Sequence, residues 1–320
     1  MAVTRDGEVD FETEAPVDGS LDVVWRHGVR ARWQQEPPVQ THWYDPHTVL
    51  LRQSKTVNYE APFLFLLFGN ERALLLDSGA TGDPAACPLR ATVDGLVDQW
   101  LAAHPREGYG LVVAHTHAHG DHVAGDPQFT DRPGTAVVPK EADAAREFFG
   151  LGSDAAALGS APVSFDLGGR VLDVLATPGH HDSSLTFYDR WTGILFTGDT
   201  VLPGRLYVAD FPAFLTTMRK LAEFAGTHPV THVLGCHIEM ARRPGRDHPL
   251  GATFQPGERA LQMTPAQLVA IRDAAVSVAD RPGVYRFDDF VIYHEPGKRE
   301  TRRLLARARW RKALAAPLRG

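Results

Sequence analysis

The chain has 320 residues, of which 43% are hydrophobic and 22% are charged. This composition supports a sizeable packed core and excludes pervasive disorder and low-complexity classes. The net charge of −6 gives no support to general nucleic-acid binding, and the longest apolar run, 61–68, is far shorter than the roughly 20 residues of a membrane helix.

The N-terminal residues and the cysteines bear on the cellular compartment. Residues 1–20 are acidic where a signal peptide would be basic and apolar, so we expect a loosely held arm and no export signal. The two cysteines, Cys87 and Cys236, cannot form a disulfide framework and fit a reducing compartment. The sequence therefore predicts a cytoplasmic protein.

Short apolar strands alternate with helices along the chain. Strands are predicted at 63–68, 73–76, 111–114, 171–175, 185–188, 194–196 and 230–234, and helices at 92–104, 141–149, from Asp210 onward and at 264–279. Asp210 and Thr264 are expected to cap the last two helices. The alternation predicts an α/β fold, in which the loops after strands carry ligand-binding side chains.

Three segments are predicted from this pattern. Residues 1–58 form an N-terminal extension with possible edge strands, 59–254 a catalytic core, and 255–320 a C-terminal helical extension packed on the core. The extension at the N-terminus is rich in aromatic residues that can cover one edge of the site, namely Trp25, Trp33, Trp43 and Tyr44. The basic stretch 298–312 is interpreted as a solvated amphipathic helix or an oligomer contact, in preference to a nucleic-acid or membrane surface.

A cluster of histidines follows the strand at 111–114. His117, His119, Asp121 and His122 place three imidazoles and a carboxylate within six residues, separated by small residues that permit a tight loop. Imidazole nitrogens bind zinc-like ions and a carboxylate balances their charge, as a binuclear site requires. An exposed polar loop with incidental histidines is the alternative, and it explains this run less well.

Three further polar residues each follow a short strand within a glycine-containing turn: His180, Asp199 and His237. Singly, each can be a capping or hydrogen-bonding residue. Together with the histidine cluster they supply two coordination shells, and Asp199 can bridge two ions about 3.5–4 Å apart.

These motifs occur in a fixed order: Asp77 in LLLDSG, the HAHGDH run, His180 in TPGH, Asp199 in FTGDT and His237 in GCH. In this order the sequence resembles the metallo-β-lactamase-fold hydrolases over residues 60–240. The resemblance implies a four-layered αββα sandwich of two mixed β-sheets flanked by helices. It is poorly specific for substrate, because the family includes lactamases, lactonases, thioesterases, nucleases and redox enzymes.

The resemblance also implies a role for each motif residue. His117, His119 and His180 would bind a first metal ion, and Asp121, His122 and His237 a second, with Asp199 bridging. Asp77 would orient the metal-binding loop from behind the ligands. Two Zn²⁺ ions per chain are expected, with Fe or Mn also compatible. His115 and His181 match no motif position and are interpreted as supporting or packing residues.

The implied reaction is attack by a metal-bridged hydroxide on a small ester, thioester or lactone. Asp121 could take or pass the proton, and Tyr207 could contact the reacting carbonyl. Arg242 and Arg243 could pair with a substrate carboxylate or phosphate. Alternatively, Tyr207 is a packing residue, and Arg242 and Arg243 belong to a solvated surface loop.

Other functions compete on the same scaffold. The main alternative is a mononuclear iron enzyme that oxidises thiols or persulfides, and a nuclease or β-lactamase is less favoured. A binding protein with a degenerate site would lack ligands, whereas none is missing here. We expect a small-molecule substrate, no nucleic-acid or membrane partner, and a possible homodimer.

Overall fold

A computed structural model describes residues 7–31, 34–152 and 161–315, so Trp33 lies outside the described residues. One six-stranded sheet has the order β1-β2-β3-β4-β5-β6. Its strands are β1 Val39–Asp45, β2 Thr48–Gln53, β3 Phe63–Phe68, β4 Arg72–Leu76, β5 Gly110–Ala114 and β6 Thr135–Val137. The first four strands are antiparallel neighbours, whereas β4, β5 and β6 are parallel, so the sheet is mixed.

The second six-stranded sheet has the order β13-β12-β10-β9-β8-β7. Its strands are β7 Val163–Asp166, β8 Val171–Ala176, β9 Leu185–Asp189, β10 Ile194–Gly198, β12 His232–Gly235 and β13 Gln262–Met263. Because β9 is antiparallel to both β8 and β10, and β12 is parallel to β10, the strands β8, β10 and β12 run in the same direction. Their carboxyl ends therefore meet at one edge of the sheet.

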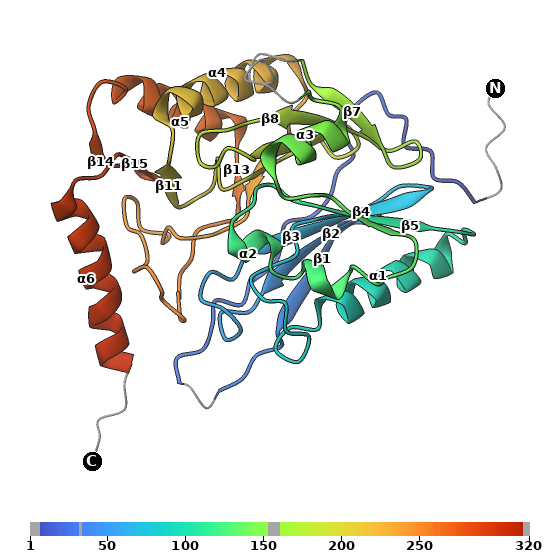
Figure 1. Cartoon of the computed structure of the whole chain (residues 1–320), viewed down its shortest axis with the longest axis horizontal. Coiled ribbons are helices and arrows are strands. Elements are labelled where there is room, and N and C mark those ends of the chain that lie inside the picture. Colours follow the sequence, from blue (N-terminus) through green and yellow to red (C-terminus); the bar gives the residue numbers. More distant parts are fainter. Residues whose placement is uncertain (1–6, 32–33, 153–160, 316–320) are drawn as a thin grey trace.

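Helices cover the outer face of each sheet (Figure 1). The helices are α1 Leu89–Ala103, α2 Gly120–Val123, the 3₁₀ turn Asp126–Gln128, α3 Ala142–Phe149, α4 Phe211–Thr227, α5 Pro265–Ser277 and α6 Lys298–Ala315. Helix α1 packs on the first sheet, and α4 and α5 pack on the second. The predicted four-layered αββα arrangement of two mixed sheets is thus confirmed.

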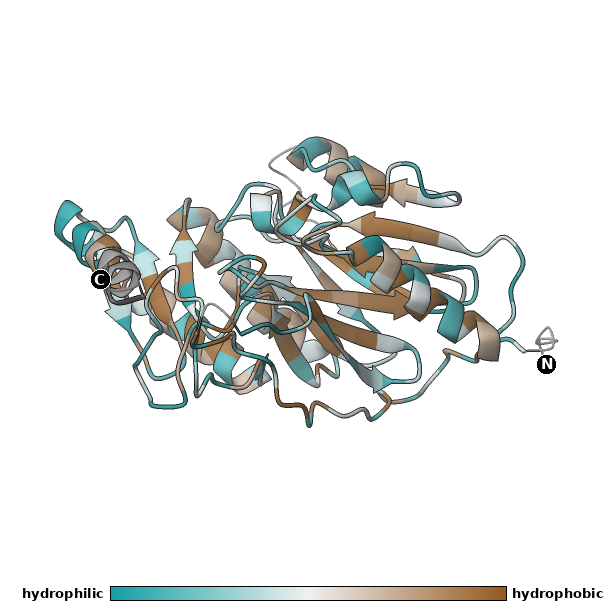
Figure 2. Ribbon diagram, turned by 90° about the horizontal axis from the view of Figure 1, so that it is seen from below, coloured by the Kyte–Doolittle hydropathy of each residue, from teal (hydrophilic) through white to brown (hydrophobic). Residues whose placement is uncertain are grey.

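Strand β3 shows why the middle layers form. Phe63, Phe65 and Leu67 face the second sheet, and the alternate residues Leu64, Leu66 and Phe68 face α1. Successive side chains of a strand point to opposite faces, so a strand covered on both faces is apolar throughout. Figure 2 shows this concentration of hydrophobic residues in the central strands, whereas the helices carry both hydrophobic and hydrophilic residues.

A small third sheet, absent from the sequence-based expectations, has the order β11-β15-β14. Its strands are β11 Arg205–Val208, β14 Gly283–Arg286 and β15 Val291–His294. The parallel pairing of β11 with β15 brings residues far apart in the chain beside the loop that follows β10. This sheet supports one side of the site described below.

Most predicted element boundaries are close to the observed ones. Helix α1 begins three residues before the predicted start at Thr92, and the strand predicted at 230–234 begins only at His232. The Asp210 side chain caps α4 and Thr264 forms a capping box with Gln267 at the start of α5, as expected. Strands β1 and β2 join the first sheet, whereas the division of the chain at residues 58 and 254 stays a prediction.

Helix α6 stands at the periphery of the molecule (Figure 1). Its side chains are described for residues 298–306, and most of these are exposed, with Leu304 packed near Val291 and Tyr293. Among the residues that the structure describes, none of the helices is long and apolar enough to cross a membrane.

Candidate metal centre

The candidate ligands are carried by loops at the ends of strands from both large sheets. Asp77 follows β4 and the His117–His122 loop follows β5, and these two strands are parallel neighbours. From the second sheet, His180 follows β8, Asp199 follows β10 and His237 follows β12. The two sheets therefore bring the predicted ligands together where they face each other.

A first cluster is formed by His117, His119 and His180. The Nε2 of His117 lies 2.9 Å from the Nδ1 of His119, and the Nε2 of His180 lies 3.3 Å and 3.1 Å from these two nitrogens. Burial lowers the pKa of all three imidazoles, to about 4 for His119. The rings are therefore neutral at pH 7, which is the form that binds a metal ion.

A second cluster is formed by Asp121, His122 and His237. The Asp121 Oδ2 lies 3.5 Å from the His122 Nε2 and 3.2 Å from the His237 Nε2, and the two nitrogens are 3.4 Å apart. Burial alone would lower the pKa of His237, but the charges of Asp199 and Asp121 raise this pKa to about 9. A divalent cation bound here would take the place of protons that the carboxylates otherwise attract.

Asp199 lies between the two clusters. Its Oδ1 is 3.5 Å from the His237 Nε2 and 3.7 Å from the His122 Nε2, whereas its Oδ2 is 3.8 Å from the His180 Nε2. Burial would raise the pKa of this carboxyl, but His237 and His122 hold it below its usual range. The Oδ1 is buried and accepts no hydrogen bond from the described residues. An ionised, buried and unsatisfied oxygen between two sets of ligands fits a cation site.

Three of the histidines are held by hydrogen bonds from the far side of the ring. The Nδ1 of His122 donates to Asp77 Oδ2 (2.8 Å), that of His180 to the Tyr207 carbonyl (2.7 Å), and that of His237 to the Glu60 carbonyl (3.1 Å). In the neutral form of each ring, which is the form that binds a metal ion, this bond leaves the Nε2 lone pair facing the cluster. The two backbone anchors were not predicted, because a carbonyl group has no side-chain signature.

Asp77 is buried and has a left-handed backbone, with φ of 66°. Besides His122, its carboxylate accepts hydrogen bonds from the Thr116 backbone N–H (2.7 Å), the Thr116 hydroxyl (2.9 Å) and the Cys236 thiol (3.2 Å). Burial raises the pKa of the Cys236 thiol, which keeps this group protonated as a donor. Asp77 thus lies behind His122, on the side away from the cluster, where the family resemblance implies a supporting residue.

The remaining predicted residues lie outside the two clusters. The Tyr207 hydroxyl accepts a hydrogen bond from the Arg205 Nε (2.8 Å), so its contact with the site is through its backbone carbonyl. Arg242 and Arg243 are exposed on a loop beyond His237. The substrate-contact roles of these three residues stay predictions.

His115 and His181 also lie outside the described groups that can hold a metal ion. The His115 Nε2 is 3.2 Å from Asp126 Oδ2, and the His181 Nδ1 is 2.8 Å from the Ser183 hydroxyl. That hydroxyl also accepts a hydrogen bond from the Ala118 backbone N–H (3.0 Å), so Ser183 supports the loop of the first cluster.

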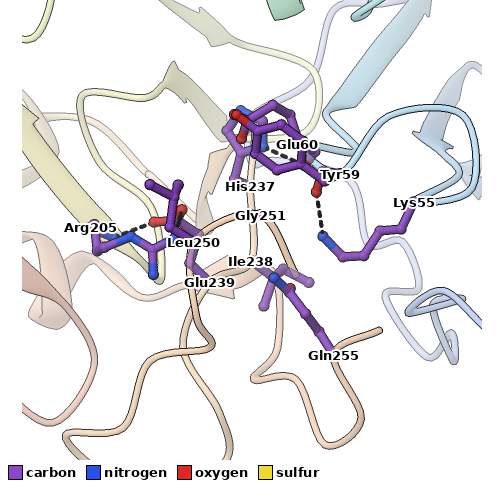
Figure 3. A pocket seen from close by; sticks show the side chains of 10 residues that line it. All are labelled: Lys55, Tyr59, Glu60, Arg205, His237, Ile238, Glu239, Leu250, Gly251 and Gln255. Atoms are coloured by element: carbon purple, nitrogen blue, oxygen red, sulfur yellow. Dashed lines mark hydrogen bonds and ion pairs between the residues drawn. The ribbon is translucent and has the colours of Figure 1, made fainter. Parts of the chain in front are cut away.

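A small pocket lies beside His237 and was not predicted from the sequence (Figure 3). Lys55, Tyr59 and Glu60 line one part of it, and Glu239 and Gln255 line another. Lys55 and Glu60 carry charge in a segment that precedes the first motif, and no spacing rule connects them to the ligands.

The sequence and the fold are similar to those of known proteins. The model of the metallo-beta-lactamase superfamily matches residues 61–232. Hydroxyacylglutathione hydrolases from Brucella ovis and Brucella abortus are 28% identical over 196 residues, which is 59% of this chain and 71% of each relative. A solved metallo-beta-lactamase from Pontibacter korlensis aligns over 74% of this chain and 99% of its own, with 16% identity and a TM-score of 0.49. The family match spans more than half of the chain and includes every candidate ligand except His237, so the chain belongs to the metallo-β-lactamase superfamily.

Proposed function

We propose that this chain is a metal-dependent hydrolase with a dinuclear site, and that its substrate is a small thioester. The observation that carries the proposal is the position of Asp199, whose two carboxylate oxygens face different three-ligand clusters. Two clusters joined by one carboxylate suit two cations better than one. The choice of a thioester rests on the curated relatives, since an acylglutathione is a thioester.

The proposal assigns some residues to binding the two ions and others to orienting the imidazole ligands. His117, His119 and His180 would hold one ion, and Asp121, His122 and His237 the other, with Asp199 between them. When bound, such ions supply Lewis-acid chemistry, because they polarise a carbonyl oxygen and acidify water. Asp77 and the carbonyls of Tyr207 and Glu60 keep the imidazoles in the orientation that binding requires.

Elemental analysis of protein purified without added metal or chelator tests the metal assignment. We expect about two equivalents of zinc per chain, together with hydrolysis of simple thioesters in a spectrophotometric assay. One equivalent of iron with little zinc, and oxygen consumption in the presence of thiols or persulfides, would instead establish the thiol-oxidising alternative.

Substitution of Asp199 tests the bridging role directly. Asp199→Asn keeps the size of the side chain but removes the negative charge, so we expect kcat/KM for a thioester to fall at least about 100-fold and metal content to drop. The matched control is Asp98→Asn, on the exposed face of α1. Unchanged turnover and metal content in Asp199→Asn would contradict the role.

A further inference from the structure

The pocket beside His237 contains a buried ammonium group. Lys55 is 3% exposed, and its Nζ donates a hydrogen bond to the Tyr59 carbonyl (3.1 Å). Figure 3 shows this contact at the pocket, next to the hydrogen bond between His237 and Glu60. An ammonium group has three donors, so one carbonyl leaves Lys55 with capacity for another acceptor.

The carboxylates near Lys55 are mostly engaged elsewhere. Glu258 forms a bidentate pair with Arg52, at 2.6 Å and 2.7 Å, and Glu239 pairs with the guanidinium of Arg205. No carboxylate oxygen of the described residues lies within 4.0 Å of the Lys55 Nζ. Lys55 is thus a buried cation without an ion-pair partner in the part of the chain that the structure describes.

A buried cation of this kind destabilises the fold unless an anionic ligand pairs with it. Burial and the neighbouring Arg52 lower the pKa of Lys55 to about 8, so the side chain is still mostly protonated at pH 7. A buried charge without a counter-ion destabilises a fold, and pairing with an anion removes that penalty. The pocket is therefore suited to an anionic group.

Two other lining residues define which anion fits. Gln255 is 4% exposed, and its Oε1 accepts no hydrogen bond from the described residues, so this oxygen can accept a hydrogen bond from an N–H group. Glu60 lines the same pocket. Since its negative charge opposes a second one, a singly charged carboxylate fits better than a dianionic phosphate.

We infer that this pocket binds a carboxylate of the substrate, remote from the hydrolysed bond, through the Lys55 ammonium, with Gln255 accepting a neighbouring N–H. The pocket shares His237 with the second cluster, so the bound carboxylate would lie near the metal-binding residues while belonging to a part of the substrate that is not cleaved. The inference rests on the proposed function in one respect: the anion bound here is taken to be part of the hydrolysed substrate.

A turnover experiment tests specificity. Two thioesters of N-acetylcysteine are compared, one with its free carboxylate and one with a carboxamide in its place. For Lys55→Met we expect the preference for the carboxylate, expressed as a ratio of kcat/KM values, to fall by about 10- to 100-fold, mainly through KM. Lys298→Met, on the exposed part of α6, removes a lysine elsewhere and should retain the preference. Equal losses for both thioesters in Lys55→Met would overturn the inference.

A binding experiment separates this inference from the proposed function. Calorimetric titration of the metal-loaded protein with N-acetylglycine and with N-acetylglycinamide needs no turnover. N-acetylglycine should bind more tightly than N-acetylglycinamide. Lys55→Met and Lys55→Gln should each lower the affinity for N-acetylglycine by about 10-fold or more. If the wild type hydrolyses neither thioester but shows this pattern, the proposed function fails and the carboxylate site stands. Equal binding of the acid by the wild type and both folded variants would rule the site out.

Discussion

The orientation of His122 depends on one buried carboxylate. Asp77 accepts its Nδ1–H, and three further donors from Thr116 and Cys236 surround the same carboxylate. These bonds fix the carboxylate, which in turn fixes the ring that faces the second cluster. The left-handed backbone of Asp77 also limits replacement, because asparagine tolerates that conformation better than most other residues.

Asp77→Asn should therefore preserve the fold while weakening the second cluster. The amide is a weaker acceptor for the imidazole N–H and also adds a donor beside the Thr116 N–H. We expect metal affinity to fall about 10- to 100-fold, as is usual when a partner behind a ligand is lost. Competition titration with a chromophoric chelator measures the effect, and Asp83→Asn, an exposed residue of the following loop, is the control. An unchanged affinity would show that Asp77 does not act through His122.

At the level of single residues, prediction from the sequence worked where side-chain chemistry carries the signal. The histidines and aspartates of the motifs converge as their order suggested, because each follows a strand. The anchors at Glu60 and Tyr207 could not be predicted, since they act through backbone carbonyls that every residue has. Lys55 was missed for a different reason: a single lysine shows its burial only after the chain has folded.

The start of helix α4 is tied to the loop that carries His180. The backbone N–H groups of Ala209 and Asp210 both donate to the Gly179 carbonyl, at 2.8 Å and 3.0 Å. Gly179 has a φ of 137°, and a Cβ there would lie 2.5 Å from the Cα of Phe214, so only glycine allows this close approach. Helix α4 thus supports a ligand of the first cluster as well as covering the second sheet.

The N-terminal cap of α4 is expected to contribute to the stability of the protein. Asp210 Oδ1 accepts a hydrogen bond from the Ala213 N–H (3.0 Å), so Asp210→Ala should lower the free energy of unfolding by about 1 kcal/mol. Asp210→Asn keeps a hydrogen-bond acceptor at the same place, so its free energy of unfolding should fall much less. Urea unfolding followed by circular dichroism measures both. Equal destabilisation by the two variants would show that the charge, and not the cap, matters.

Among the elements, the buried strands were predictable and the peripheral ones were not. A run such as 63–68 is apolar on both faces because both are covered, and this makes a strong signal. Strand β1 mixes polar and apolar residues at the sheet edge, and the strands of the third sheet have four residues each, too few for a periodic pattern. Their pairing is set by contacts between distant segments.

At the scale of the whole molecule, His47 joins parts that are distant in the chain. Its ring contacts Phe11 of the N-terminal arm and Trp191 of the turn between β9 and β10, with centroid distances of 5.4 Å and 6.1 Å. Its Nδ1 accepts a hydrogen bond from the Trp100 Nε1 of α1 (3.0 Å). Burial lowers the pKa of His47 to about 4, so the folded protein holds this ring neutral.

This lowered pKa makes stability depend on pH. Between about pH 6.5 and pH 4 the unfolded chain binds a proton at His47 that the folded chain does not, so acidification favours unfolding. From pH 7.5 to pH 5 the residue should cost about 2 kcal/mol of stability. His47→Gln, which keeps an acceptor for Trp100, should remove that part of the decline. Urea unfolding at both pH values, with chelator present throughout, measures the difference, and parallel declines in the two proteins would refute the assignment.

The arrangement of β10 and β12 sets the order in which the centre can be completed during protein synthesis. The chain emerges from the ribosome with the His117–His122 loop first, then His180 and Asp199, and His237 last. His237 reaches its place only when β12 has paired with β10, after α4 has crossed the sheet between them. A nascent chain can therefore present all three donors of one cluster while the other still lacks its final imidazole.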